Sequence, residues 1–223
     1  MSVRTELTQL TELTKSMNKR LSLLQLDVLK EVGTIGAGRA ATALSDLIAK
    51  KVEITVPEVK LIPIENVSNL LEKRDTLFFV IDMEITGEVS GRIFLLFSPD
   101  NAKILAENLL GKPKESLDLR DELLQSSLKE SANILSGSYV SALADMTNLN
   151  ILISSPSLAI DMVGAILDFI FIQIAQYTEE ALIIKTNIKV SDVDLEGLFL
   201  FFPSTESLTK IFATLGVNEQ GGQ

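Results

Sequence analysis

The 223-residue sequence contains no cysteine and no histidine. These absences exclude a disulfide framework, a cysteine nucleophile, a structural zinc site and a Ser-His-Asp triad. Any catalysis must therefore use carboxylates, amides, hydroxyls, lysine or arginine, or a metal held by oxygen ligands. The lack of cysteine is also typical of an intracellular protein.

Basic residues are too few to outweigh acidic ones, at 20 against 30, which gives a net charge of −10. This balance argues against a nucleic-acid partner or an anionic membrane, both of which need basic patches. Long uncharged apolar runs are missing too. The N-terminus has no signal core, and Asp161 and Asp168 interrupt the apolar stretch 158–175. We predict a soluble, cytoplasmic protein without membrane insertion.

What is present is a spacing that occurs twice. An offset of 99 residues carries one polar set onto the other, and both sets end at a proline after an equal gap of 22 residues. Further identical pairs at this offset include Lys30/Lys129 and Gly38/Gly137. The two sets are Asp27, Glu31, Thr34 and Pro57, and Ser126, Glu130, Asn133 and Pro156.

The apolar patterns repeat in the same order as the polar sets. We predict helices at 26–50, 66–73, 99–110, 122–146, 158–176 and 205–215, and strands at 52–56, 76–85, 91–97, 149–154, 181–190 and 197–202. Residues 87–91 are the predicted hairpin turn. The wider spacing between Pro156 and Gly197 indicates an insertion in the second copy, largely its long helix.

A tandem duplication explains this order, with one copy at 26–112 and the other at 122–216. Each copy has too few strands to bury its own sheet face. We therefore expect an α/β fold with one domain at 26–223, in which pseudo-symmetric repeats share a sheet that helices cover on a face. Residues 1–25 form a predicted helical extension. The near-heptad apolar spacing over 3–28 fits either packing on its own domain or pairing with another helix.

Positions i, i+4 and i+7 line up on one stripe of a helix. Glu130 and Asn133 therefore present a carboxylate, which can pair with a cation, and an amide, which can orient a water for in-line attack on phosphorus. The first copy has Glu31 but carries Thr34 in place of the amide. The alternative is that each stripe is only the solvated face of an amphipathic helix.

Two further features invite functional interpretation. Gly33, Gly36 and Gly38 do not follow the order of a phosphate-binding loop. Because a helical glycine costs roughly 1 kcal/mol against alanine, they indicate close backbone approach between the halves or to a partner. Asp161 and Asp168 lie seven residues apart, hence on one face of the predicted long helix, as solvated or partner-facing charge.

The motif Asp/Ser-x3-Glu-x2-Asn-x22-Pro occurs in full at 126–156 and with Thr34 in place of the asparagine at 27–57. This pattern resembles the CheC family of chemotaxis phosphatases, relatives of CheX and the FliY middle domain. Residues 26–57 resemble the first family signature and 126–156 match the second. The resemblance implies two α/β repeats around an antiparallel sheet. It also implies hydrolysis of the aspartyl phosphate of the response regulator CheY.

By this resemblance, Glu130 pairs with the regulator's active-site lysine and Asn133 positions the attacking water. Mg²⁺ belongs to the phosphorylated CheY, and the chain needs no cofactor or metal of its own. Thr34 makes the first site weak or silent. The resemblance further implies binding of the receptor deamidase CheD through about 157–176, which gives Asp161 and Asp168 a partner-facing role.

Two other functions remain open from the sequence. One is a non-catalytic adaptor or flagellar-switch module, like the FliM middle domain. The other is a regulator of CheD with residual phosphatase activity.

Overall fold

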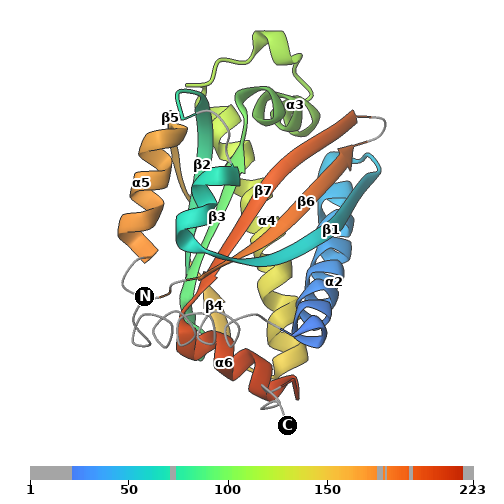
Figure 1. Ribbon diagram of the computed structural model, residues 1–223. Helices are drawn as coiled ribbons and strands as arrows, with labels where there is room; N and C mark the ends of the chain where they lie inside the picture. Colours follow the sequence, from blue (N-terminus) through green and yellow to red (C-terminus); the bar gives the residue numbers. More distant parts are fainter. Residues whose placement is uncertain (1–21, 71–73, 175–177, 179, 191–192, 218–223) are drawn as a thin grey trace, which may run out of the picture.

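The computed structural model describes residues 22–217, apart from 71–73, 175–177, 179 and 191–192 (Figure 1). The α-helices are α2 (Leu23–Ile48), α3 (Pro99–Leu110), α4 (Glu122–Thr147), α5 (Val163–Ile174) and α6 (Thr205–Thr214), with short 3₁₀ turns η1 (Ile64–Leu70) and η2 (Lys114–Ser116). The strands are β1 (Val52–Pro63), β2 (Leu77–Gly87), β3 (Gly91–Phe97), β4 (Ile151–Ile153), β5 (Ser157–Met162), β6 (Glu180–Val190) and β7 (Val193–Pro203).

One antiparallel sheet joins the two halves of the chain, as the duplication predicts. Its order is β1-β6-β7-β3-β2-β4, and β5 also pairs with β2. Read from either edge, the sheet presents equivalent strands: β1 corresponds to β4 and β5, β6 to β2, and β7 to β3. The first half therefore completes its sheet with strands of the second half, and the pseudo-two-fold axis passes between β7 and β3.

Each of the two prolines of the repeated spacing lies at an irregularity in an edge strand, and the irregularity is of the same kind at both edges. In β1, Val56 and Pro57 lie opposite a single β6 residue, Thr186. At the other edge, three residues that end at Pro156 separate β4 from β5 opposite two residues of β2. Each edge strand thus carries one extra residue, where proline's missing N–H breaks no ladder bond. The prediction that the strand ends at Pro57 was wrong, because β1 continues through the bulge to Pro63.

The helices α2 and α4 pack side by side on one face of the sheet and run in opposite directions (Figure 1). Their inner faces join the main core, in which Leu29, Val32, Leu124 and Leu128 are fully buried. Pseudo-equivalent residues, Ala49 and Asn148, end the two helices with left-handed backbone conformations. The duplication is therefore visible in helix length, packing and termination.

The predicted helix over 158–176 was wrong at its start. Residues Ser157–Met162 form strand β5 against β2, and the helix begins only at Val163. Exposure alternates along β5, so side chains point to opposite sides with the period of a strand. Asp161 thus lies on a strand and Asp168 on α5, and they do not share a helical face.

The sheet is covered on both faces rather than on the one expected. A second core lies on the side opposite α2 and α4, where α5 packs against Val80, Phe94 and Leu200. Arg92 fastens this layer by pairing with Asp82 (Nε–Oδ1 3.1 Å) and donating to Gln173 of α5 (3.1 Å). Among the helices of the described ranges, none combines the length and apolar character that a membrane crossing requires.

The N-terminal prediction can be checked only at its end. Residues 3–21 of the heptad-like segment lie outside the described residues. Ser22 is extended and caps α2: its hydroxyl accepts from the N–H of Gln25 (3.2 Å), and Gln25 Oε1 accepts from the N–H of Ser22 (2.9 Å). The seam predicted over 3–28 is therefore interrupted at Ser22, and residues 23–28 belong to α2.

Candidate active site on the paired helices

The second stripe lies on the solvent side of α4. Ser126, Glu130 and Asn133 are all exposed. In the described ranges of the chain, neither the Glu130 carboxylate nor the Asn133 amide makes a hydrogen bond or ion pair. The buried Leu128 and Ala132 hold the backbone of this turn against the core. A fixed helix therefore presents a free carboxylate and a free amide to an incoming partner.

The first stripe is also exposed on its helix, but its side chains differ in their hydrogen bonding. Asp27, Glu31 and Thr34 are exposed on α2. The Thr34 hydroxyl, however, donates to the carbonyl oxygen of Lys30 in its own helix (2.8 Å). Such back-bonding satisfies the hydroxyl locally and turns its donor away from solvent. The first stripe thus offers a carboxylate beside a hydroxyl whose proton is already engaged.

The edge-strand bulge lies beneath the first stripe. A Cβ added to Gly33, next to Thr34, would lie 3.4 Å from Cγ1 of Val56, the bulge residue beside Pro57. Pro57 itself is exposed, and Pro156 is half-buried at the opposite edge. The fixed distance from stripe to proline therefore reflects how each helix packs on its edge strand.

The close helix approach predicted from small residues occurs at Gly36. A Cβ there would lie 2.8 Å from Cα of Tyr139, so only glycine fits. A Cβ added to Gly38 or Gly137, by contrast, would have no heavy atom within 4 Å. These two glycines therefore do not press against the other half, and the alternative of close approach by a partner stays a prediction. An ion pair between Arg39 and Asp145 (2.7 Å) also joins the helices.

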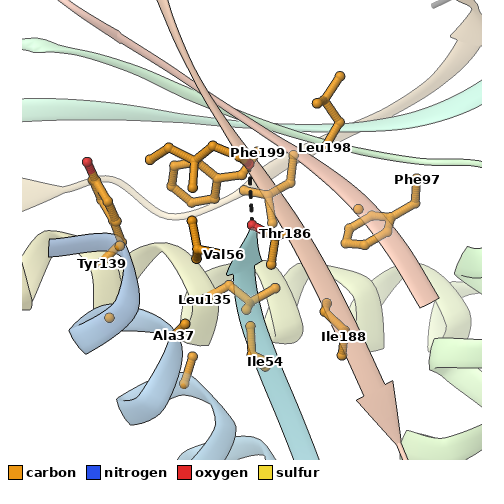
Figure 2. Close-up of a pocket in the computed structure, with 16 residues that line it drawn as sticks. Ala37, Ile54, Val56, Phe97, Leu135, Tyr139, Thr186, Ile188, Leu198 and Phe199 are labelled. Carbon is orange, nitrogen blue, oxygen red and sulfur yellow. Dashed lines mark hydrogen bonds between the residues drawn. The ribbon is translucent and has the colours of Figure 1, made fainter. Parts of the chain in front are cut away.

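A small apolar cavity of about 30 Å³ lies between the helix pair and the sheet (Figure 2). Ala37, Ile54, Val56, Leu135 and Phe199 are among the residues that line it. Tyr139 also contributes, and burial raises the pKa of its hydroxyl. In the part of the chain that the structure describes, the hydroxyls of Tyr139 and Ser136 lack hydrogen-bond partners. Most of the lining residues belong to the main core, so this space is part of the core and not of the candidate site.

Asp161 and Asp168 lie away from both stripes, on the α5 side of the sheet. The Asp161 carboxylate accepts from the N–H of Met162 (2.7 Å), and Asp168 pairs with Arg74 (3.2 Å). Both carboxylates are exposed. Nearby on the outer face of α5, Phe169 and Ile172 are 41% and 74% exposed. Within the described residues, no cluster of three or more acidic side chains could hold a metal ion.

Sequence reasoning missed two leucines that extend the stripes. Leu24 and Leu123 are pseudo-equivalent, and both are more than half exposed, at 59% and 51%. Each precedes its stripe by three residues and so lies on the same helical face. The 99-residue offset already pairs them, and an apolar residue on a polar stripe was the available signal.

Comparison with known proteins agrees with these geometric parallels. The CheC-like family matches residues 24–61 and 125–160, which contain both stripes and both prolines. The CheY-P phosphatase CheC of Bacillus subtilis (strain 168) is 32% identical over 198 residues, or 87% of this chain and 95% of that protein. The flagellar motor switch phosphatase FliY of the same organism is 31% identical over 137 residues, or 61% of this chain and 35% of FliY.

A solved structure extends the agreement to the fold. Thermotoga maritima FliY superposes with a TM-score of 0.72 at 22% identity, over 88% of this chain and 98% of that chain. The shared fold and the identity to CheC over nearly the whole chain lead to one conclusion: the protein belongs to the CheC family of chemotaxis phosphatases, with CheX and FliY as relatives.

Proposed function

We propose that this protein hydrolyses the aspartyl phosphate of the response regulator CheY, mainly through the α4 stripe. Family membership supports the reaction, and the CheY-P phosphatase CheC, at 32% identity, supports the substrate. The protein acts in the cytoplasm, where the regulator is found. It needs no cofactor of its own, because the Mg²⁺ at the phosphoryl group belongs to CheY.

In the proposed reaction, water attacks the phosphorus in line with the bond to the regulator's aspartate. That P–O bond breaks, and inorganic phosphate leaves. Asn133 orients the water, because its amide can accept from the water and donate to an equatorial phosphoryl oxygen. Glu130 pairs with the regulator's active-site lysine and fixes the approach. Ser126 lies on the same stripe of α4, and Pro156 lies at the edge strand on which α4 packs. Neither residue takes part in the chemical step.

The observation that carries this assignment is the contrast between Asn133 and Thr34. The amide of Asn133 is exposed and unengaged among the described residues, whereas the Thr34 hydroxyl is bonded to Lys30 of its own helix. A back-bonded threonine cannot supply the amide's paired donor and acceptor to a water. The first site, with Glu31 and Asp27, is therefore proposed to bind a regulator without hydrolysing it efficiently.

The test is the decay of phosphorylated CheY from the same genome with wild type, Asn133→Ala and Thr34→Ala. Loss of a water-positioning amide should reduce the stimulated decay about 100-fold. Thr34→Ala should change it less than twofold, which makes it the matched control. A wild-type chain that leaves the decay unchanged would refute the enzyme, and leave the adaptor function. Equal losses in both variants would refute the asymmetry.

A second proposal places the receptor deamidase CheD on α5. The supporting observation is the exposed apolar pair Phe169 and Ile172, beside the carboxylates of Asp161 and Asp168. This surface lies on the opposite side of the sheet from the α4 stripe, so CheD and CheY can bind at the same time. Ile172→Lys should abolish CheD binding in a pull-down of purified proteins and leave CheY-P hydrolysis intact. Unchanged CheD binding would contradict the proposal.

A further inference from the structure

The helices α2 and α4 run side by side in opposite directions (Figure 1), and their closest contact lies near the end of each stripe. The contact of Gly36 with Tyr139 fixes where they cross. Two residues forward along α2 and two back along α4 lead to Gly38 and Gly137. Each of these glycines lies one helical turn beyond Thr34 or Asn133. The two stripes therefore end at neighbouring positions.

Internal packing does not require either of these glycines. A Cβ on Gly38 or Gly137 would meet no heavy atom within 4 Å, unlike one on Gly36. Alanine would serve the helix better at both positions. Glycine nevertheless occupies the equivalent position in both copies, one helical turn beyond Thr34 and Asn133. A surface without side chains lets a partner's loops approach the helices closely.

The spacing of the stripes limits how many partners fit. Thr34 and Asn133 each lie about 6 Å along the axis from the glycine pair, Gly38 and Gly137, at 1.5 Å per residue. With packed helix axes about 8–10 Å apart, the two positions are separated by about 15 Å. A receiver domain of about 100 residues is roughly 30 Å across. A regulator docked over one stripe must therefore cover the end of the other.

We propose that the two stripes and the glycine pair between them form one docking surface, which holds a single phosphorylated regulator at a time. This inference rests on the proposed function and adds its stoichiometry. A regulator on the α4 stripe is hydrolysed. One on the α2 stripe meets Glu31 without the amide, is released intact, and meanwhile blocks Asn133. The degenerate site thus acts as a built-in competitor of the active one.

The experiment measures binding of CheY activated with beryllofluoride and Mg²⁺ to the full-length protein, by titration calorimetry and native mass spectrometry. The expected result is one CheY per chain. Gly38→Leu and Gly137→Leu should each weaken binding about tenfold, because a side chain now fills the shared surface. Ala43→Leu, an exposed addition on α2 off the stripe, is the matched control and should bind as wild type.

Thermal unfolding of all three variants separates docking from folding, since both glycine variants should melt at or above the wild-type temperature. Two CheY molecules per chain, or leucine variants that bind as tightly as wild type, would overturn the inference. If wild type dephosphorylates CheY but binds two copies, only this inference fails. If wild type neither binds nor dephosphorylates CheY, the proposed function fails as well.

Discussion

The helices α2 and α4 present two versions of one surface. Both have an exposed leucine, a glutamate and a bare glycine at equivalent positions, and both pack on an edge strand with a proline at its bulge. They differ at the position where the Asn133 amide has no partner among the described residues and the Thr34 hydroxyl is bonded to Lys30 of its own helix. The frame of the site thus persists in both copies, although the group that we propose to position the water differs between them.

This persistence has a physical reason. The residues that hold each helix, such as Leu29 and Leu128, are fully buried, whereas the stripe residues are exposed. An exposed substitution such as asparagine to threonine changes folding free energy by only a few tenths of a kcal/mol, roughly within the ±0.5 kcal/mol typical of surfaces. The fold therefore constrains the inner face of each helix and leaves its outer face to function.

The largest expected effect tests the packing asymmetry between Gly36 and Gly38. Gly36→Ala should destabilise the protein by about 2 kcal/mol, because the new methyl meets the backbone of Tyr139. Gly38→Ala, only two residues away, should stabilise it by about 1 kcal/mol through helix propensity. Chemical denaturation of both variants measures the difference. Shifts of the same sign would contradict the described helix crossing.

A second prediction compares the two glutamates. Glu130→Gln keeps the shape of the side chain and removes the charge that we propose to pair with the regulator's lysine. It should lower kcat/KM for CheY-P about tenfold, or about 1.4 kcal/mol in transition-state stabilisation. Glu31→Gln should lower kcat/KM less than twofold, because on our proposal the first site does little hydrolysis. An equal loss in both variants would show that the two stripes share the work.

A third prediction uses Tyr139, whose pseudo-equivalent on α2 is Ala40. Burial raises the pKa of the Tyr139 hydroxyl above its ordinary value near 10. Below that value this hydroxyl does not make the free energy of unfolding depend on pH. As pH rises from there toward the folded-state pKa, the free energy of unfolding falls. Tyr139→Phe removes a buried hydroxyl with no partner among the described residues, so at pH 7 it should be neutral or stabilising by about 1 kcal/mol.

The same variant should also lose part of the alkaline destabilisation. Denaturation at pH 7 and at pH near 11 compares the two proteins. Identical pH dependence in wild type and Tyr139→Phe would contradict the burial of this hydroxyl.

The smallest expected effect concerns the exposed leucines. Leu123→Ala removes an apolar contact at the outer end of the active stripe and should raise KM for CheY-P about threefold, with kcat unchanged. Leu24→Ala, on the α2 stripe, is its counterpart and should leave kcat/KM unchanged, because unproductive binding affects kcat and KM by the same factor. A change in kcat instead would mean that Leu123 acts on the chemistry rather than on docking.

Much of the fold was predictable because it depends on periodic patterns. The repeat, the shared sheet and helix α4 follow from apolar spacing and from the 99-residue offset. The start of α2 was also accessible, since Ser22 and Gln25 have the S-x-x-Q spacing of a capping box. It was missed because the apolar seam continues across Ser22.

The errors share a tertiary cause. Leu158 to Met162 were predicted as helix because they begin an apolar stretch, but they pair with β2 and form a strand instead. Pro57 was taken as a strand end, although a bulge at a sheet edge tolerates it. Local sequence does not reveal which partner strand is adjacent, so these choices were not accessible from it.

The residues of the site were predictable, whereas the hydrogen bonds that their side chains make were not. Spacing placed Glu130 and Asn133 on one exposed face, and the structure agrees. The engagement of Thr34 with Lys30 depends on a side-chain rotamer, which no sequence pattern specifies. The replacement of the amide by a hydroxyl at position 34 was visible in the sequence. The hydrogen bond that engages this hydroxyl was not.

The central claim is that the amide at position 133, absent at position 34, decides which stripe hydrolyses CheY-P. Its most direct test adds Thr34→Asn to Asn133→Ala and follows the decay of phosphorylated CheY. We predict that the double variant regains at least about tenfold over Asn133→Ala alone, because the α2 stripe then has its own water-positioning amide beside Glu31. A double variant as inactive as Asn133→Ala would contradict the claim.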